Sequence, residues 1–212
     1  MRILITAGPT QEYFDSVRFI SNPSSGKMGY AIAAEAVKRG HEVVLVSGPV
    51  ALPEPSKAEV IQVVSAKEMF QAATSVFSEC HAAVMVAAVC DYRPSRRLQH
   101  KLRKQNRVRS IQLQPTEDIL SHLGRIKGRR VLVGFAMEDH NHRKNAEAKL
   151  RRKRCDAMVL NGPGNVGTDT AEVEILLAET GWCPPISGSK AHLAAAVVAL
   201  VESLAAAARL VD

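Results

Sequence analysis

Aromatic residues are scarce in this sequence: phenylalanine, tryptophan and tyrosine together make up 4% of its 212 residues. Proteins that stack the bases of single-stranded nucleic acids rely on such side chains. The net charge is +7, and lysines and arginines gather in two stretches, 93–109 and 144–154. Because clustered basic side chains also bind polyphosphates, we expect a small polyphosphate ligand rather than a nucleic acid.

Three further absences narrow the class of protein. No apolar run approaches the roughly 18–20 residues of a membrane span, so no membrane partner is expected. The opening segment MRILITAGPT reads as a strand and its turn rather than as a signal peptide. The four cysteines include no CxxC pair, which is typical of a reducing compartment. Together these features predict a cytoplasmic location.

Apolar runs and helical periodicity alternate along the chain, and this pattern indicates βαβ units. Strands are predicted at 2–7, 41–49, 60–64, 82–89, 131–136, 156–161 and 172–179, the last in a hairpin or at an edge. Helices are predicted at 26–39, 66–79, 117–126, 143–154 and Lys190–Leu210.

This alternation predicts one α/β domain, 1–212, with a Rossmann-like, mostly parallel sheet flanked by helices. The basic stretch 93–115 breaks the rhythm. It is expected to form a flap or a dimerisation arm.

The loop after the first strand contains no GxGxxG fingerprint of a dinucleotide-binding protein. Instead, Ser24, Ser25 and Gly26 open the first helix, where free N–H groups and the helix dipole favour an anion. A serine cap and a tightly packed glycine would explain the same residues. Arg18 and Asn22 precede them, and could grip an anion and stabilise an oxyanion respectively, or be ordinary loop residues.

Other candidate residues lie at the end of the predicted central strand and in the basic stretches. Asp91 follows the strand, where ligands of open α/β sheets bind. Lys101 stands in a run of charge that could close over a triphosphate or simply face solvent. Lys149 and Lys153 are four residues apart on one predicted helix, an arrangement that an anion between them would favour.

Taken in order, these segments resemble a known family. GPTQEYFDSVRFISNPSSGKMGYAIAAEAVKRGHEVVLVSGPV (8–50) is similar to the opening of the bacterial phosphopantothenate–cysteine ligase domain. The similarity continues through AAVCDYRP, KLRK, PTEDIL, VGFAMED and AEAKLRRKRCD, across essentially the whole chain. Such domains commonly follow a flavin-dependent decarboxylase domain, which is absent here, so no flavin is expected.

The resemblance implies a reaction in two steps. The carboxylate of 4′-phosphopantothenate attacks the α-phosphate of a nucleoside triphosphate, which gives an acyl-nucleotidylate and pyrophosphate. The amine of L-cysteine then displaces the nucleotide and forms an amide. The bacterial pattern favours CTP, with ATP as the alternative, and Mg²⁺. Family members are dimers, so a homodimer is expected.

The resemblance also assigns residues. It implies catalytic roles for Asn22, Lys101 and Arg18. It implies nucleotide contacts for Gly8, Ser24, Ser25, Gly26, Met28, Ala87, Ala88, Asp91, Lys101, Thr116, Glu117, Asp118, Ile119, Phe135, Lys149 and Lys153. It names no metal ligands.

Two departures from the family pattern stand out. Arg103 takes the third position of the family's KxKK element, which keeps the charge but changes its geometry. Glu117 adds an acid to a segment written NPDI or TPDI in many relatives. Two other functions are consistent with the βαβ opening and the charge: a nicotinamide-dependent Rossmann oxidoreductase, and a non-catalytic nucleotide-binding protein.

Overall fold

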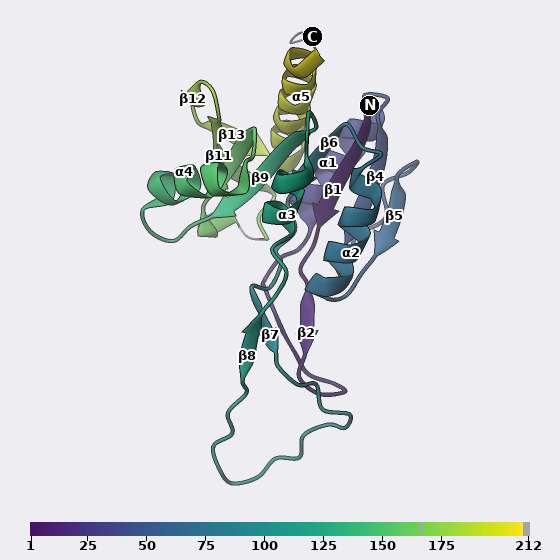
Figure 1. Ribbon diagram of the computed structural model, residues 1–212, viewed down its shortest axis with the longest axis vertical. Coiled ribbons are helices and arrows are strands. Elements are labelled where there is room, and N and C mark those ends of the chain that lie inside the picture. Colours follow the sequence, from purple (N-terminus) through teal and green to yellow (C-terminus); the bar gives the residue numbers. More distant parts are fainter. Residues whose placement is uncertain (166, 210–212) are drawn as a thin grey trace.

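A nine-stranded sheet with helices on both faces forms the body of the protein (Figure 1). The computed structural model describes residues 1–165 and 167–209. Six parallel strands make up the centre of the sheet, in the order β10-β9-β6-β1-β4-β5. Their bounds are β1 (Arg2–Ala7), β4 (Glu42–Ser47), β5 (Glu59–Gln62), β6 (Ala82–Met85), β9 (Val131–Met137) and β10 (Ala157–Asn161). The Rossmann-like, mostly parallel fold is therefore confirmed.

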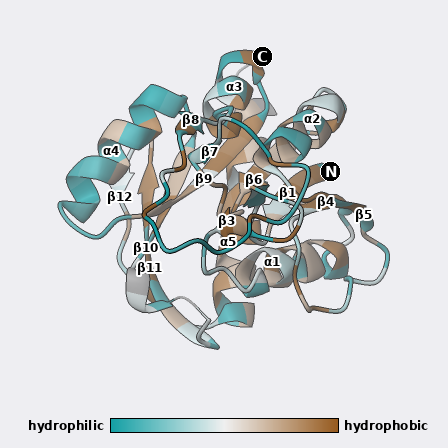
Figure 2. Cartoon of the chain, turned by 90° about the horizontal axis from the view of Figure 1, so that it is seen from below, coloured by the Kyte–Doolittle hydropathy of each residue, from teal (hydrophilic) through white to brown (hydrophobic). Residues whose placement is uncertain are grey.

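Alternate side chains of the strands point to opposite faces, and each face has its own helices. Ile3 and Ile5 belong to the core covered by α1 (Lys27–Lys38) and α5 (Lys190–Arg209). Leu4 belongs to the opposite core, under α2 (Ala66–Phe77), α3 (Ile119–Ile126) and α4 (His142–Lys153). The strands are largely hydrophobic between these layers (Figure 2). The predicted last residue of α5, Leu210, lies outside the described residues.

An antiparallel edge completes the sheet beside β10, after the short helix η1 (Pro163–Asn165). There β11 (Thr170–Leu177) pairs with β12 (Gly181–Trp182) and β13 (Ile186–Ser189). The prediction of a late strand in a hairpin or at an edge is confirmed.

Helix α5 corrects the expectation that no segment is long and apolar enough to span a membrane. By length and composition alone, Lys190–Ala208 passes that test. However, Leu193, Val197 and Val201 are buried against the sheet and α1. A core helix meets the same criteria, so this is weak evidence for a membrane span.

Strand β6 is shorter than the predicted 82–89, and Thr6 of β1 accounts for the difference. Its hydroxyl oxygen accepts hydrogen bonds from the N–H groups of Val86 and Ala87, at 3.2 Å each. A side chain thus replaces the strand ladder at these two residues, and parallel pairing with the segment after β1 resumes as a single bridge between Pro9 and Ala88.

Two antiparallel ribbons project from the carboxyl edge of the sheet (Figure 1). They are β2 (Gln11–Tyr13) with β3 (Phe19–Ser21), and β7 (Tyr92–Pro94) with β8 (Leu113–Pro115). The two ribbons and the loop 95–112 are called the arm below. These four strands were not predicted, because three-residue strands are too short to show a periodicity.

Helices α3 and α4 meet at a glycine. A Cβ atom on Gly124 would lie 1.9 Å from the carbonyl oxygen of Lys153. We therefore expect Gly124→Ala to lower the free energy of unfolding by about 1–3 kcal/mol, because backbone must shift to admit the methyl group. Urea denaturation measures this, with Gly162→Ala as the control, since nothing lies within 4 Å of its added Cβ atom. Equal unfolding midpoints for the two variants would contradict the expectation.

Candidate functional site

A cavity of about 440 Å³ opens at the carboxyl edge of the sheet, between the ends of β1, β6 and β9 and the helices α3 and α4. Parallel sheets bind ligands at this edge. Most of the nucleotide-contact residues implied by the resemblance line it. They are Ala87, Asp91, Thr116, Glu117, Asp118, Ile119, Phe135, Lys149 and Lys153.

Five further lining residues were missed by the sequence analysis: Thr6, Met85, Val89, Pro115 and Leu120. Thr6 carries the signal that could have found it, a hydroxyl at the end of an otherwise apolar strand. The others are apolar residues next to predicted positions, and nothing in the pattern separates them from core residues.

The segment that follows β6 lies between the cavity and Asn22. Ala87 and Val89 line the cavity. The Asn22 side-chain amide donates to the carbonyl oxygens of Ala88 and Val89, at 3.0 and 3.1 Å. The structure thus brings Asn22 and Ala88 together beside the cavity, although neither lines it.

The N-terminus of α1 lies next to the end of β1. Gly26 is the N-cap residue, with a φ of +75°, and no side chain caps the helix. A Cβ atom added there would lie 3.5 Å from the Cα atom of Gly8, so the two glycines pack closely. The first N–H groups of such a helix are available to an anion. Both interpretations of this glycine, close packing and an anion site, thus agree with its geometry.

The residues around Gly26 differ in their surroundings. The N–H group of Ser24 donates to the carbonyl oxygen of Asn22 at 2.8 Å, which ties the start of the helix to the Asn22 loop. Ser25 is half-buried. Met28 packs against the hydrophobic core, so only its backbone could meet a phosphate.

Two lysines from α4 enter the cavity with different partners. Lys153 contacts the Asp118 carboxylate, which also accepts a hydrogen bond from the N–H group of Ser121. For Lys149, no hydrogen bond or ion pair occurs with any residue in the described parts of the chain. Burial lowers the pKa of both lysines; the Glu138 and Asp91 carboxylates offset part of that effect at Lys149, and the Asp91 carboxylate offsets part of it at Lys153. Lys149 is therefore the better placed of the two to meet an anion.

Arg18 lies elsewhere, at the turn between β2 and β3. Its guanidinium donates to the fully buried carboxylate of Asp15 at 2.5 and 2.9 Å, and to the carbonyl oxygen of Leu102 at 2.6 Å. The N–H group of Leu102 donates to the same carboxylate at 3.0 Å. The structure thus ties Arg18 to the loop of the arm, and its predicted catalytic role remains a prediction.

This clamp, formed by Asp15, Arg18 and Leu102, is electrostatically strong. Burial alone would raise the pKa of Asp15, but the hydrogen bonds from Leu102 and Arg18 outweigh it. They hold the pKa of that carboxyl well below its usual range. The clamp fixes the loop backbone next to Lys101.

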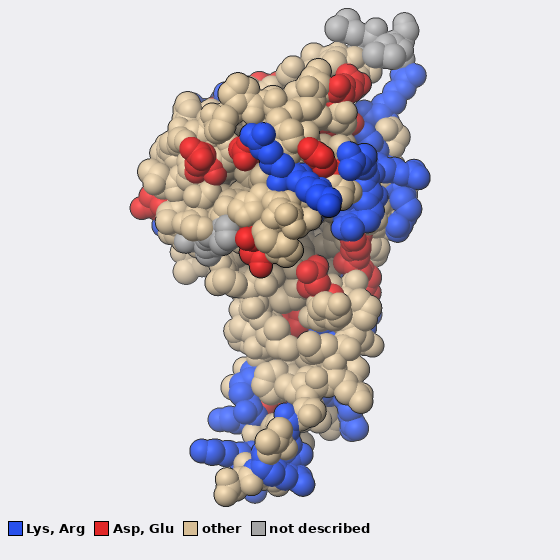
Figure 3. All heavy atoms as spheres, turned by 90° about the vertical axis from the view of Figure 1, so that its left-hand side faces the viewer, with Lys and Arg blue, Asp and Glu red and all other residues tan. Residues whose placement is uncertain are grey.

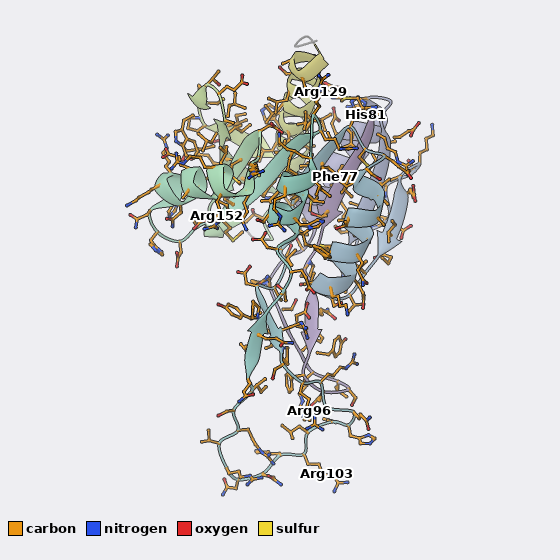
Figure 4. All side chains as sticks on the ribbon, in the orientation of Figure 1. Phe77, His81, Arg96, Arg103, Arg129 and Arg152 are labelled. Atoms are coloured by element: carbon orange, nitrogen blue, oxygen red, sulfur yellow. The ribbon has the colours of Figure 1, made fainter. Side chains whose placement is uncertain are left out.

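The structure does not bring Lys101 to the cavity. Its neighbour Leu102 is fixed at the tip of the β2–β3 ribbon, whereas Asn22 follows the other end of β3. The three residues of β3 span about 10 Å. Arg96 and Arg103 mark the far end of the arm in Figure 4, and Figure 3 shows basic side chains covering that end.

The sequence matches the family described as the DNA/pantothenate metabolism flavoprotein C-terminal domain over residues 1–204. The chain belongs to this family. Among curated relatives, a bifunctional coenzyme A biosynthesis protein, CoaBC of Bacillus subtilis (strain 168), is 43% identical over 183 residues. That alignment covers 84% of this chain and 45% of the relative.

A second curated relative, from an unknown prokaryotic organism, is named cysteine/cysteine sulfinic acid decarboxylase. It is 45% identical over 181 residues, which cover 82% of this chain and 50% of the relative. The chain thus spans about half the length of the curated relatives it matches.

Solved structures of the same fold agree with this family. The C-terminal domain of a CoaBC protein superposes with a TM-score of 0.82 at 38% identity, covering 96% of this chain and 94% of that one. A Cab2 mutant in complex with phosphopantothenate-cysteine has a TM-score of 0.82 at 17% identity, covering 98% and 88%. At that identity, the second likeness shows the fold alone.

The clamp leads to a prediction about the arm. Asp15→Asn removes the charge that accepts from Arg18 and Leu102, so the loop should detach and trypsin should cleave within 96–109 roughly tenfold faster. Asp169→Asn is the matched control, because that exposed carboxylate pairs with Lys27 outside the arm.

The same variant should change the pH dependence of stability. A depressed carboxyl pKa stabilises the fold above the unfolded value of about 4, and this contribution is lost as the pH falls toward the folded value. The difference in unfolding free energy between wild type and Asp15→Asn should therefore be constant from about pH 5 to 8 and shrink below about pH 4. A difference that stays constant down to pH 3 would show that the carboxylate charge contributes nothing.

Proposed function

We propose that this chain catalyses the nucleoside-triphosphate-dependent ligation of 4′-phosphopantothenate with L-cysteine, in coenzyme A biosynthesis, with CTP as the preferred nucleotide and ATP as the alternative. The observation that carries the proposal is the cavity. Segments implied by the ligase resemblance, far apart in the sequence, line one hollow at the carboxyl edge of the sheet. Membership of the family and the 43% identity to the Bacillus subtilis protein support it.

In the first step, two anions must meet, because a carboxylate attacks a triphosphate. Lys149 in the cavity and the uncapped N-terminus of α1 supply a field that attracts phosphates. Phe135 and the small Ala87 give the cavity apolar surface for a base. The chain's part in this step is to hold the two substrates against their mutual repulsion.

In the second step, cysteine's amine attacks the activated carboxyl group. Asn22 lies beside the cavity, held by two carbonyl oxygens through its side-chain nitrogen. This orientation leaves its amide oxygen to accept a hydrogen bond from an incoming amine. We assign Asn22 the positioning of that amine and of the acyl-nucleotidylate.

Mg²⁺ fits this site as a companion of the nucleotide. The described residues include no group of three or more His, Cys, Asp or Glu side chains that could hold a metal ion. Mg²⁺ commonly binds one or two carboxylates together with substrate phosphates. Asp91, exposed at the mouth of the cavity, would hold it, and the ion would neutralise phosphate charge.

A homodimer is the second part of the proposal, with the arm as its contact. The arm exposes large apolar side chains, among them Phe19 at 41%, Tyr92 at 57% and Leu113 at 49%. Exposed apolar patches of this kind mark protein interfaces. Because Lys101 is held a ribbon's length from Asn22 of its own chain, a partner's cavity is its expected destination.

The assay for the ligase function measures pyrophosphate. With CTP, phosphopantothenate, cysteine and Mg²⁺, we expect pyrophosphate release that depends on phosphopantothenate, while omission of cysteine leaves the acyl-nucleotidylate bound. If none of CTP, ATP, GTP and UTP gave pyrophosphate release, the proposal would be wrong. Retention of NADH fluorescence would point to the oxidoreductase instead.

Mixing two inactive variants tests the shared site. Asn22→Asp should accumulate the acyl-nucleotidylate, and Lys101→Gln should slow its formation. If each site uses Asn22 of one chain and Lys101 of the other, unfolding and refolding the variants together restores about a quarter of wild-type activity, since half the dimers hold one intact site. Mixtures that stay inactive, while wild-type protein regains activity in the same procedure, would place both residues on one chain.

A further inference from the structure

Glu117 is an unusual residue in the wall of the cavity. One of its carboxylate oxygens, Oε2, is buried and has no hydrogen-bond partner within the described parts of the chain. Leaving a buried carboxylate oxygen without a donor costs free energy, and such groups call for an explanation. A ligand that brings an N–H donor into the cavity would supply the missing partner.

The residues on either side of Glu117 already have partners, and they fix its backbone. The Thr116 hydroxyl donates to the carbonyl oxygen of Cys90 at 2.6 Å, and the Thr116 N–H group donates to that of Asp91 at 2.9 Å. Asp118 caps α3 and contacts Lys153. Glu117 therefore has a fixed position, as a residue that discriminates between ligands requires.

Lys149 lines the same cavity as Glu117. Among the described residues of this wall, it is the only cation that makes no hydrogen bond or ion pair. The two side chains both line the cavity, yet no ion pair joins them in the described structure. One needs an anion and the other needs a hydrogen-bond donor. A ligand with phosphate at one end and an amine at the other satisfies both, and a nucleotide with an amino base has this chemistry.

We propose that Glu117 accepts a hydrogen bond from the exocyclic amine of the nucleobase and thereby selects amino bases over their keto counterparts. The proposal rests on the ligase function only in that the ligand is a nucleoside triphosphate. A carboxylate accepts from the N4 amine of cytosine. The same carboxylate would face the O4 carbonyl of uracil, where two acceptors repel each other.

The experiment compares the binding of CTP and UTP to the full chain by titration calorimetry with Mg²⁺. Wild type should bind CTP at least about tenfold more tightly than UTP. Glu117→Gln should lose most of that preference, because an amide can turn either its oxygen or its nitrogen toward the base. Glu117→Ala should weaken CTP binding and leave UTP binding unchanged or improved. ATP and ITP form a second pair with the same amine-to-carbonyl change.

Glu42→Gln is the matched control, because Glu42 is exposed at the start of β4, and it should keep the wild-type ratio. Thermal unfolding confirms that the variants fold. A ratio that is the same in wild type and Glu117→Gln would overturn the inference, as would a loss of affinity for all nucleotides alike, which indicates a magnesium ligand. Absence of binding by every nucleotide would overturn it too.

Pyrophosphate release, measured on the same samples, separates this inference from the ligase function. Release with an unchanged CTP-to-UTP ratio would leave the ligase function standing and remove Glu117 from base selection. A CTP-to-UTP binding ratio that changes in Glu117→Gln, without pyrophosphate release by the wild type, would support Glu117 in base selection and contradict the ligase function.

Discussion

The hydroxyl group of Thr6 is the interaction on which the candidate site depends. Strands β1 and β6 are neighbours in the parallel sheet, and Thr6 is paired with Met85, the last residue of β6. By accepting from the next two N–H groups, the hydroxyl satisfies the backbone where the β6 ladder ends, and pairing resumes at Ala88, whose N–H group donates to the carbonyl oxygen of Gly8 at 2.9 Å. Residues 86–89 therefore run beside the segment that follows β1, and Ala87 and Val89 line the cavity.

The segment that follows β6 has a second role. It presents the carbonyl oxygens of Ala88 and Val89 to Asn22, whose loop in turn leads into the N-terminus of α1. The cavity, Asn22 and the open helix end are therefore three parts of one arrangement. The arm is held separately, through Asp15 and through Glu12, whose carboxylate accepts from the first N–H group of α2.

The sequence was informative where local pattern decides structure. The parallel strands and their helices followed from apolar runs and periodicity, because each element of that kind carries its own signal. Ser65 caps α2 and forms a capping box with Glu68, a local arrangement of the same kind. The end of β6 was missed, because it depends on a side chain 80 residues away in the sequence.

The candidate site, like the fold, was predictable only in part. Pattern pointed to Asp91, Lys149 and Lys153, and the family resemblance supplied the other predicted cavity residues, because pattern alone could not place Glu117 and Lys149 in one wall. Arg18 also matches the family motif; the structure shows its guanidinium bound to Asp15 and Leu102, and its catalytic role stays a prediction. Only the folded chain shows which groups already have partners.

The distribution of partners separates the groups that maintain the fold from those that await a ligand. Asp15, Arg18, Thr116 and Asp118 are all engaged, and their hydrogen bonds hold loops in place. Burial lowers the pKa of Lys149, the Glu138 and Asp91 carboxylates offset only part of that effect, and its ammonium group makes no hydrogen bond or ion pair in the described structure. The Oε2 atom of Glu117 is buried without a hydrogen-bond partner in the described structure. The described structure contains no ion pair between these two side chains, so a ligand that brings phosphate to Lys149 and an N–H donor to Glu117 gains affinity from both contacts.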